Sequence, residues 1–286
     1  MSALAQSPQS LSFPSRVQPL AALRWNAGAK HRVLAVHGWL DNAMSFAPLA
    51  QYLPDCDLVA IDLPGHGQSG HLPNGFWYHF VDYLGDVLDA LDALGWERAN
   101  LLGHSLGGAT VSTLAAATPQ RVERLLVIEA LGPLAVAPGK SAESLRRGVA
   151  DRRSAADKRK RVIPSVEAAI SARLQATPMQ PSSARMLVEG NLTAVAGGFQ
   201  WTSDPRLRLS TPARIAEAQV QEWLAAIEAA TLLIAAAEHP PYFDPSTRER
   251  RVGMLREARV CILPGQHHLH MDTPEPVASA IRAFLD

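Results

Sequence analysis

The run LLGHSLGGATVSTLAAATP, residues 101–119, decides the fold of this chain. A short apolar segment leads into Gly103-His104-Ser105-Leu106-Gly107, and a helical segment of small residues follows. A serine on a tight strand-to-helix turn adopts an uncommon backbone conformation, and glycines flank it because larger side chains would collide there. The pattern G-x-S-x-G in this setting predicts Ser105 as a nucleophile at a helix N-terminus, where developing negative charge is favoured.

Further apolar runs of strand length alternate with helical patterns on both sides of this turn. They lie at residues 32–38, 56–65, 123–132, 230–238 and 258–265. Strands that are apolar throughout, with helices between them, predict an α/β fold with a mostly parallel, doubly wound sheet covered on both faces. The alternation stops between residues 133 and 229, which predicts a helical cap inserted over the carboxyl edge of the sheet, where such sheets bind ligands.

The predicted organisation is therefore a loose N-terminal tail over residues 1–15, a core over 16–132 and 230–286, and a cap over 133–229. Within the cap, the basic stretch 146–161 has no interleaved aromatic residues and is interpreted as a solvated helix face. The whole chain carries 27 basic and 27 acidic residues, so its charge gives no footprint for nucleic acid or for an anionic membrane.

Targeting features are absent from the sequence pattern. The first 16 residues lack the basic start and apolar stretch of a signal peptide, and no run approaches the roughly 20 apolar residues of a spanning helix. Cys56 and Cys261 lie far apart and each borders an apolar run, which fits a reducing compartment. We expect a cytoplasmic protein that acts on a small molecule; the sequence does not indicate its oligomeric state.

A serine nucleophile needs donors for the oxyanion that forms on the substrate. The backbone N–H of Leu106, directly after the serine, is one donor by construction. The second should come from a loop after an earlier strand, and VHGWLDN (36–42) fits, with the Trp39 N–H as the candidate. Each such donor is typically worth about 3 kcal/mol of the barrier.

Several segments together resemble the α/β-hydrolase superfamily, and within it the serine hydrolase-like proteins. These are HGWLDNA, AIDLPGHGQS, GHSLGG and GQHHLHMDTPEPVA in that order, with YHFVDYLGDV (78–87), EALGPL (129–134) and GGFQWTSDPRLRLSTPARIAEAQ (197–219). The resemblance covers about residues 17–286. It implies an α/β-hydrolase fold with a helical cap and a Ser–His–acid triad that uses no cofactor, and it does not imply a substrate.

The resemblance also implies a position for the base. In this fold the histidine follows the last strand, and it commonly stands seven residues before the proline that begins the closing helix. Counting back from Pro274 gives His267, with His268 as the alternative. For the acid, Glu238 after the strand at 230–238 is preferred, and Glu129 and Asp244 remain alternatives.

The density of histidines in GQHHLHMDTP (265–274) raises the question of a metal. His267 and His270 could share an ion only with further ligands such as His239 or Asp272, and no metal motif supports them, so no metal is expected.

The sequence thus predicts a serine hydrolase that cleaves an ester-like bond of a small apolar substrate through an acyl-enzyme. The alternatives are a non-catalytic ligand-binding protein on the same scaffold and a carbon–carbon bond hydrolase.

Overall fold

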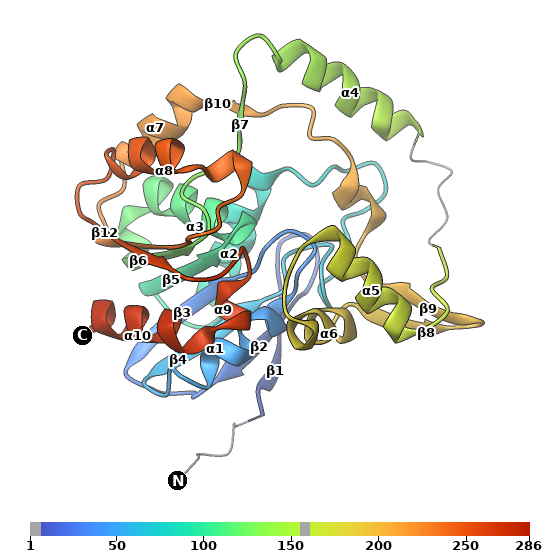
Figure 1. Cartoon of the computed structure of the whole chain (residues 1–286), viewed down its shortest axis with the longest axis horizontal. Coiled ribbons are helices and arrows are strands. Elements are labelled where there is room, and N and C mark those ends of the chain that lie inside the picture. The colour runs from blue at the N-terminus through green and yellow to red at the C-terminus, as the bar shows by residue number, and fades with distance from the viewer. Residues whose placement is uncertain (1–6, 155–160) are drawn as a thin grey trace.

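A computed structural model describes residues 7–154 and 161–286, and its centre is an eight-stranded sheet (Figure 1). The strand order is β1-β2-β4-β3-β5-β6-β11-β12. β2 runs opposite to both of its neighbours, and every pair from β4 to β12 is parallel. The strands are β1 (Gln9–Phe13), β2 (Leu20–Trp25), β3 (His31–Val36), β4 (Cys56–Ile61), β5 (Ala99–His104), β6 (Val122–Ile128), β11 (Thr231–Ala236) and β12 (Ala258–Leu263).

Helices cover both faces of this sheet, as predicted. Leu34 and Val36 of β3 point into one buried cluster, and Val33 and Ala35 point into the other. This alternation follows from the two-residue period of a strand and explains why the strand is apolar throughout. The first cluster is closed by α2 (Tyr83–Ala93), α3 (Leu106–Ala117) and α7 (Glu217–Ala225), the second by α1 (Ala47–Ala50), α9 (Leu269–Asp272) and α10 (Pro274–Leu285).

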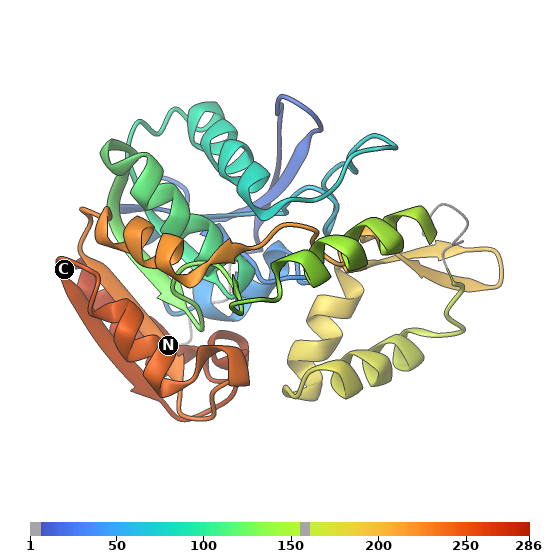
Figure 2. The same ribbon diagram turned by 90° about the horizontal axis from the view of Figure 1, so that it is seen from above.

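The insertion leaves and rejoins the core through two short strands that pair with each other. β7 (Ala135–Val136) and β10 (Ile215–Ala216) are parallel neighbours. Figures 1 and 2 show that the elements between them stand outside the layers of the sheet and its helices. They are α4 (Ser141–Ser154), α5 (Val166–Ala176), α6 (Pro181–Glu189), and the hairpin of β8 (Leu192–Val195) and β9 (Gly198–Trp201). We call residues 137–214 the cap.

Three expectations from the sequence need correction. Gln9–Phe13 lies within the predicted loose tail but forms the edge strand β1, paired in register with β2. The insertion contains strands as well as helices, because the turn at Gly197–Gly198, both with positive φ, lets β8 and β9 pair. α7 belongs by its packing to the core, since Val220 and Leu224 lie in the same cluster as α3.

Residues 1–6 of the predicted tail and 155–160 of the basic stretch lie outside the described residues. Of the helices formed by the described residues, none combines the length and apolar character needed to cross a bilayer.

Candidate active site

Ser105 stands on the predicted tight turn between β5 and α3. Its backbone has φ 51° and ψ −112°, and its N–H donates to the Ile128 carbonyl at 2.9 Å. A Cβ on Gly103 would lie 2.4 Å from the Gly107 carbonyl oxygen, and one on Gly107 would lie 1.9 Å from the Val36 carbonyl oxygen. Both flanking positions therefore require glycine, and the serine side chain is presented at the carboxyl end of the central strand.

His267, in the loop between β12 and α9, lies against Glu129. Nδ1 of His267 is 3.1 Å from Oε2 of Glu129, whose side chain is fully buried at the end of β6. The other carboxylate oxygen accepts the Ala236 N–H at 2.6 Å. A buried carboxylate needs such partners because it has no water. Glu129 has φ 60°, an uncommon conformation that turns its side chain toward β11. Nε2 of His267 has no partner in the described parts of the chain.

The carboxylate preferred from the sequence lies elsewhere. Glu238 is exposed and its Oε2 accepts a hydrogen bond from Gln266 Nε2 at 3.0 Å. Asp244 caps α8 (Pro245–Val252), where its Oδ1 accepts the Thr247 N–H at 2.7 Å. Of the three carboxylates considered from the sequence, Glu129 contacts His267, whereas the preferred Glu238 binds Gln266 instead. The strand order explains this contact. β6 lies beside β11, and Glu129 directly follows Ile128, which pairs with Ile234 of β11.

Tyr242 is a residue of the site that the sequence did not reveal. It lies in η6 (Pro241–Phe243), where its hydroxyl shares a hydrogen bond with Ser105 and its ring meets that of His267 edge to face at 6.4 Å. Tyr242 therefore contacts both the serine and the histidine. Partial burial and the nearby Glu129 charge raise its pKa above 10.0, which keeps the hydroxyl protonated. No spacing rule marks this tyrosine in the sequence.

The two candidate oxyanion donors are backbone N–H groups after the end of β3 and at the start of α3. Leu106 is the first residue of α3, so its N–H has no acceptor within the helix. Trp39 follows β3, and Leu40 next to it has φ 60°. Within residues 7–154 and 161–286, neither N–H has a backbone acceptor. Both donors are therefore available to a ligand.

The remaining histidines of the run pack together beneath the site. His104, at the end of β5, donates from Nε2 to the His267 carbonyl at 2.8 Å, and its ring lies 4.2 Å from that of His270. His268, the alternative base, is buried and binds Asp41 at 3.2 Å through Nε2. Nε2 of His268 is thus already bound to a carboxylate, whereas Nε2 of His267 has no partner among the described residues.

Asp41, His104 and His268 are the one set of potential metal ligands found among the described residues. The set differs from that considered from the sequence, since Asp272 accepts the Ser183 hydroxyl at 2.6 Å and His239 is exposed. An arginine already stands beside the set, with Nη2 of Arg173 2.5 Å from Oδ1 of Asp41. The positive charge beside Asp41 therefore comes from the protein itself.

These buried histidines predict a marked loss of stability in acid. Burial lowers the pKa of His66 and His104 to about 3 and holds that of His270 well below 6.5. In the unfolded chain each binds a proton as the pH falls through 6.5, while the folded protein does not. The stabilisation is therefore complete above pH 6.5 and is lost as the pH falls toward the folded-state values.

The variant His270→Leu removes one of these titrating groups. Neither ring nitrogen of His270 has a partner among the described residues, so leucine fits the apolar contact with Phe46 without leaving a polar group unpaired. We expect the fall in unfolding free energy between pH 6.5 and 4.5 to become shallower by about 1.4 kcal/mol per pH unit, one proton. Urea denaturation across this range measures it, with exposed His239→Gln as control. Equal slopes for His270→Leu and the wild type would contradict the prediction.

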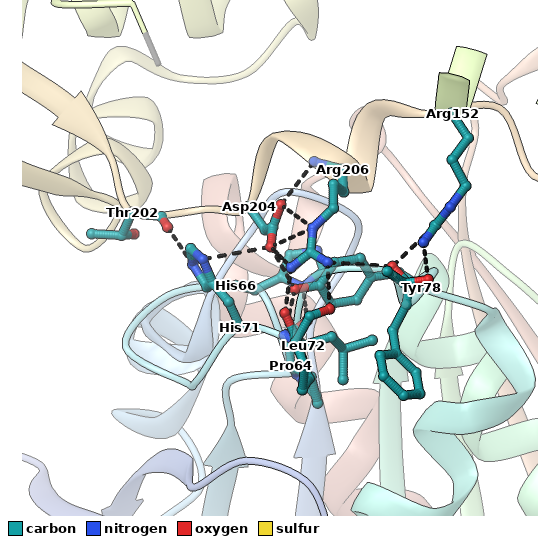
Figure 3. A network of polar contacts seen from close by, with 12 residues as sticks. Pro64, His66, His71, Leu72, Tyr78, Arg152, Thr202, Asp204 and Arg206 are labelled. Atoms are coloured by element: carbon teal, nitrogen blue, oxygen red, sulfur yellow. Dashed lines mark hydrogen bonds and ion pairs between the residues drawn. The ribbon is translucent and has the colours of Figure 1, made fainter. Parts of the chain in front are cut away.

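A polar network joins the cap to the loop that follows β4 (Figure 3). Buried Asp204 accepts the Tyr78 hydroxyl at 2.8 Å and Nη2 of Arg206 at 2.6 Å. The same guanidinium donates to the carbonyls of Leu72 and Pro73. Burial would raise the pKa of Asp204, but the hydrogen bonds from Arg206 and Tyr78 lower it, so the carboxylate stays charged. The network fixes η5 (Pro205–Arg208) of the cap against the core.

Comparison with known proteins identifies the family of this chain. The family model described as the alpha/beta hydrolase fold matches residues 31–274. A serine hydrolase-like protein of Danio rerio is 32% identical over 271 residues, covering 91% of this chain and 83% of that protein.

Solved structures show the same fold. The crystal structure of the hypothetical protein PA1622 from Pseudomonas aeruginosa PAO1 is 34% identical with a TM-score of 0.91, covering 97% of this chain and 99% of that one. A thioesterase domain from the curacin biosynthetic pathway has a TM-score of 0.86 at 22% identity, over 97% of this chain and 100% of the domain. The fold, the turn at Ser105 and these relatives lead to one conclusion: the chain belongs to the α/β-hydrolase family and, within it, to the serine hydrolase-like proteins.

Proposed function

We propose that this α/β hydrolase cleaves an ester-like bond of a small apolar substrate through an acyl-enzyme on Ser105, with His267 as base and Glu129 as the triad acid. The observation that carries the proposal is the contact of a fully buried carboxylate with Nδ1 of His267 beside the serine turn. A carboxylate there fixes the imidazole tautomer with the proton on Nδ1 and stabilises the imidazolium that forms during the reaction.

Acylation follows from this arrangement. The Ser105 oxygen attacks the carbonyl carbon of the substrate while its proton passes to Nε2 of His267. The backbone N–H groups of Trp39 and Leu106 hold the oxyanion. When the tetrahedral intermediate collapses, the bond to the leaving group breaks and His267 returns the proton to that group. Glu129 remains ionised throughout.

Deacylation repeats the sequence with water. His267 takes a proton from the water molecule as its oxygen attacks the acyl carbon, and then returns that proton to Ser105 as the acid product departs. The Tyr242 hydroxyl contacts Ser105 and so lies beside the reacting oxygen in both half-reactions. Both half-reactions use the same oxyanion donors.

An apolar substrate is favoured by the side chains around the serine. Tyr242, which contacts Ser105 and His267, leaves 48% of its surface exposed, and Trp39, whose N–H is the proposed oxyanion donor, leaves 51% exposed. Large aromatic surfaces that remain exposed beside a nucleophile fit an acyl or alkyl group better than a charged one. Among the described residues, no second function has an observation in its favour. A binding protein does not need the Glu129–His267 contact, and a carbon–carbon hydrolase would need further polar groups in the cap.

The test is covalent labelling with a fluorophosphonate probe. Wild-type protein should be labelled on the tryptic peptide that contains Ser105, and Ser105→Ala should not be labelled although its circular dichroism spectrum is unchanged. Ser112→Ala, which removes a buried hydroxyl two turns along α3, serves as a matched control and should be labelled like the wild type. Folded wild-type protein that never reacts at Ser105 would overturn the proposal in favour of the binding protein.

A further inference from the structure

The loop that carries the Trp39 N–H is attached to the cap at four consecutive residues. We call residues 38–42 the oxyanion loop. Two of the attachments use side chains of this loop, Trp39 and Asn42, as donors to carbonyls of the cap. The other two use cap side chains, Arg173 and Asn191, as donors to the loop. The pairs are Trp39 Nε1 to Leu207 O at 3.0 Å, Asn191 Nδ2 to Leu40 O at 3.2 Å, Arg173 Nη2 to Asp41 Oδ1 at 2.5 Å, and Asn42 Nδ2 to Leu187 O at 3.0 Å.

The Arg173–Asp41 contact is the charged member of this set, and it is buried. The side chain of Asp41 is 1% exposed and that of Arg173 is 13% exposed. Arg173 comes from α5, so an arginine of the cap supplies the countercharge for a carboxylate of the core. Burial alone would raise the pKa of Asp41, but the charges of His268 and Arg173 hold it well below the usual range. Without the guanidinium, the buried carboxylate would lose one of the two groups that most favour its charged form.

Asp41 also connects the oxyanion loop to the loop that carries the base. Its second oxygen, Oδ2, lies 3.2 Å from Nε2 of His268, the residue directly after His267. The backbone of the oxyanion loop is packed tightly against the same oxygen: a Cβ on Gly38 would lie 2.7 Å from it. The carboxylate therefore lies between the start of the oxyanion loop and the loop that carries the base.

From these contacts we propose that Arg173 is a positioning residue for catalysis: through Asp41 it holds the oxyanion loop, and so the Trp39 N–H, in the geometry that stabilises the oxyanion. The cap thus completes the oxyanion hole as well as covering the site. This inference rests on the proposed hydrolase function, because it assigns Trp39 as an oxyanion donor. Arg173 itself needs no contact with the substrate.

The expected signature is a loss in kcat with little change in KM. Removal of an entire oxyanion donor lowers kcat by about 10²- to 10³-fold, so displacement of one donor should cost about 10- to 100-fold. Because Arg173 acts on a group used in the transition state, KM should stay within about threefold. Lysine at this position keeps the charge but lacks the planar fork, so Arg173→Lys should fall between the wild type and Arg173→Met.

The experiment measures kcat and KM with p-nitrophenyl butyrate for wild type, Arg173→Lys, Arg173→Met and Arg173→Ala. Arg185→Met is the matched control, since Arg185 lies on α6 of the same cap and forms only exposed ion pairs with Glu167 and Glu189. Added guanidinium chloride at low, non-denaturing concentration should restore part of kcat in Arg173→Ala. It should not raise kcat in the wild type or in Arg185→Met.

Folding is controlled separately. If Arg173→Met does not fold because Asp41 is left buried and unpaired, the double variant Asp41→Asn/Arg173→Met removes that charge and should fold with the same loss of kcat. Trp39→Phe tests the attachment at Leu207 and should lower kcat by a smaller factor. If folded Arg173→Met has the same kcat as Arg185→Met and Ser105 is still labelled, the inference about Arg173 is overturned. Wild type that is never labelled would instead overturn the proposed function.

Discussion

Glu129→Gln is expected to lower kcat about 10⁴-fold, the size of effect seen when the acid of a serine triad is replaced by its amide. The amide offers an N–H to Nδ1 of His267 and so favours the imidazole tautomer with its proton on Nε2, which cannot accept the proton of Ser105. The fold should persist, because the amide oxygen can still accept the Ala236 N–H that Glu129 accepts now. KM for p-nitrophenyl butyrate should change little, since Glu129 does not contact the substrate.

Two matched variants complete the measurement. Glu238→Gln keeps an acceptor for Gln266 on an exposed side chain, and Asp244→Asn keeps the cap of α8. Both should retain kcat within about twofold, as exposed substitutions away from the reacting groups generally do. A loss of 10³-fold or more in Glu238→Gln, with Glu129→Gln active, would return the acid to the position preferred from the sequence.

His267→Ala should have the largest effect, a loss in kcat of about 10⁶-fold, as found for the histidine of a serine protease triad. No other ring among the three neighbouring histidines can replace it. His268 is held by Asp41, and His270 is fully buried beside His104. The exposed His239→Ala is the control and should retain full activity.

A variant of His268, the alternative base, provides the comparison that best tests the role of His267. His268→Gln keeps a donor for Asp41 and should lower kcat far less, by about 10-fold at most, because His268 acts only through that carboxylate. Steady-state kinetics together with the rate of fluorophosphonate labelling separate the two histidines. Equal losses in His267→Ala and His268→Gln would contradict the assignment of His267.

The parts of the site that are local in the chain were predictable, and those set by contact between distant strands were not. The turn at Ser105 follows from glycines two residues to either side, and its φ of 51° agrees with that reasoning. The choice of His267 as base rests on the family resemblance, which places the histidine seven residues before the proline that begins the closing helix, here Pro274. The contact of Glu129 with His267 depends instead on β11 lying beside β6 and on the φ of 60° at Glu129 itself. No local sequence pattern predicts either feature.

The same distinction applies to the fold. Strands that are apolar throughout, such as β4, are recognised from composition alone because both of their faces are buried. β1 was missed because an edge strand of mixed polarity, QSLSF, looks like a polar tail until its partner β2 is known. The β8–β9 hairpin and Tyr242 were missed for a related reason, since their roles depend on neighbours far away in the sequence.

The pairing of β7 with β10 has a consequence for how such enzymes diversify. Because the chain leaves and re-enters the core at adjacent points, a cap can change in length or sequence without disturbing the register of the central sheet. Substrate range and reaction chemistry can thus evolve on separate segments, with one restriction. If Arg173 acts as proposed, a cap transplanted from a relative must bring a cation to Asp41, because a hybrid without one is expected to have a lower kcat.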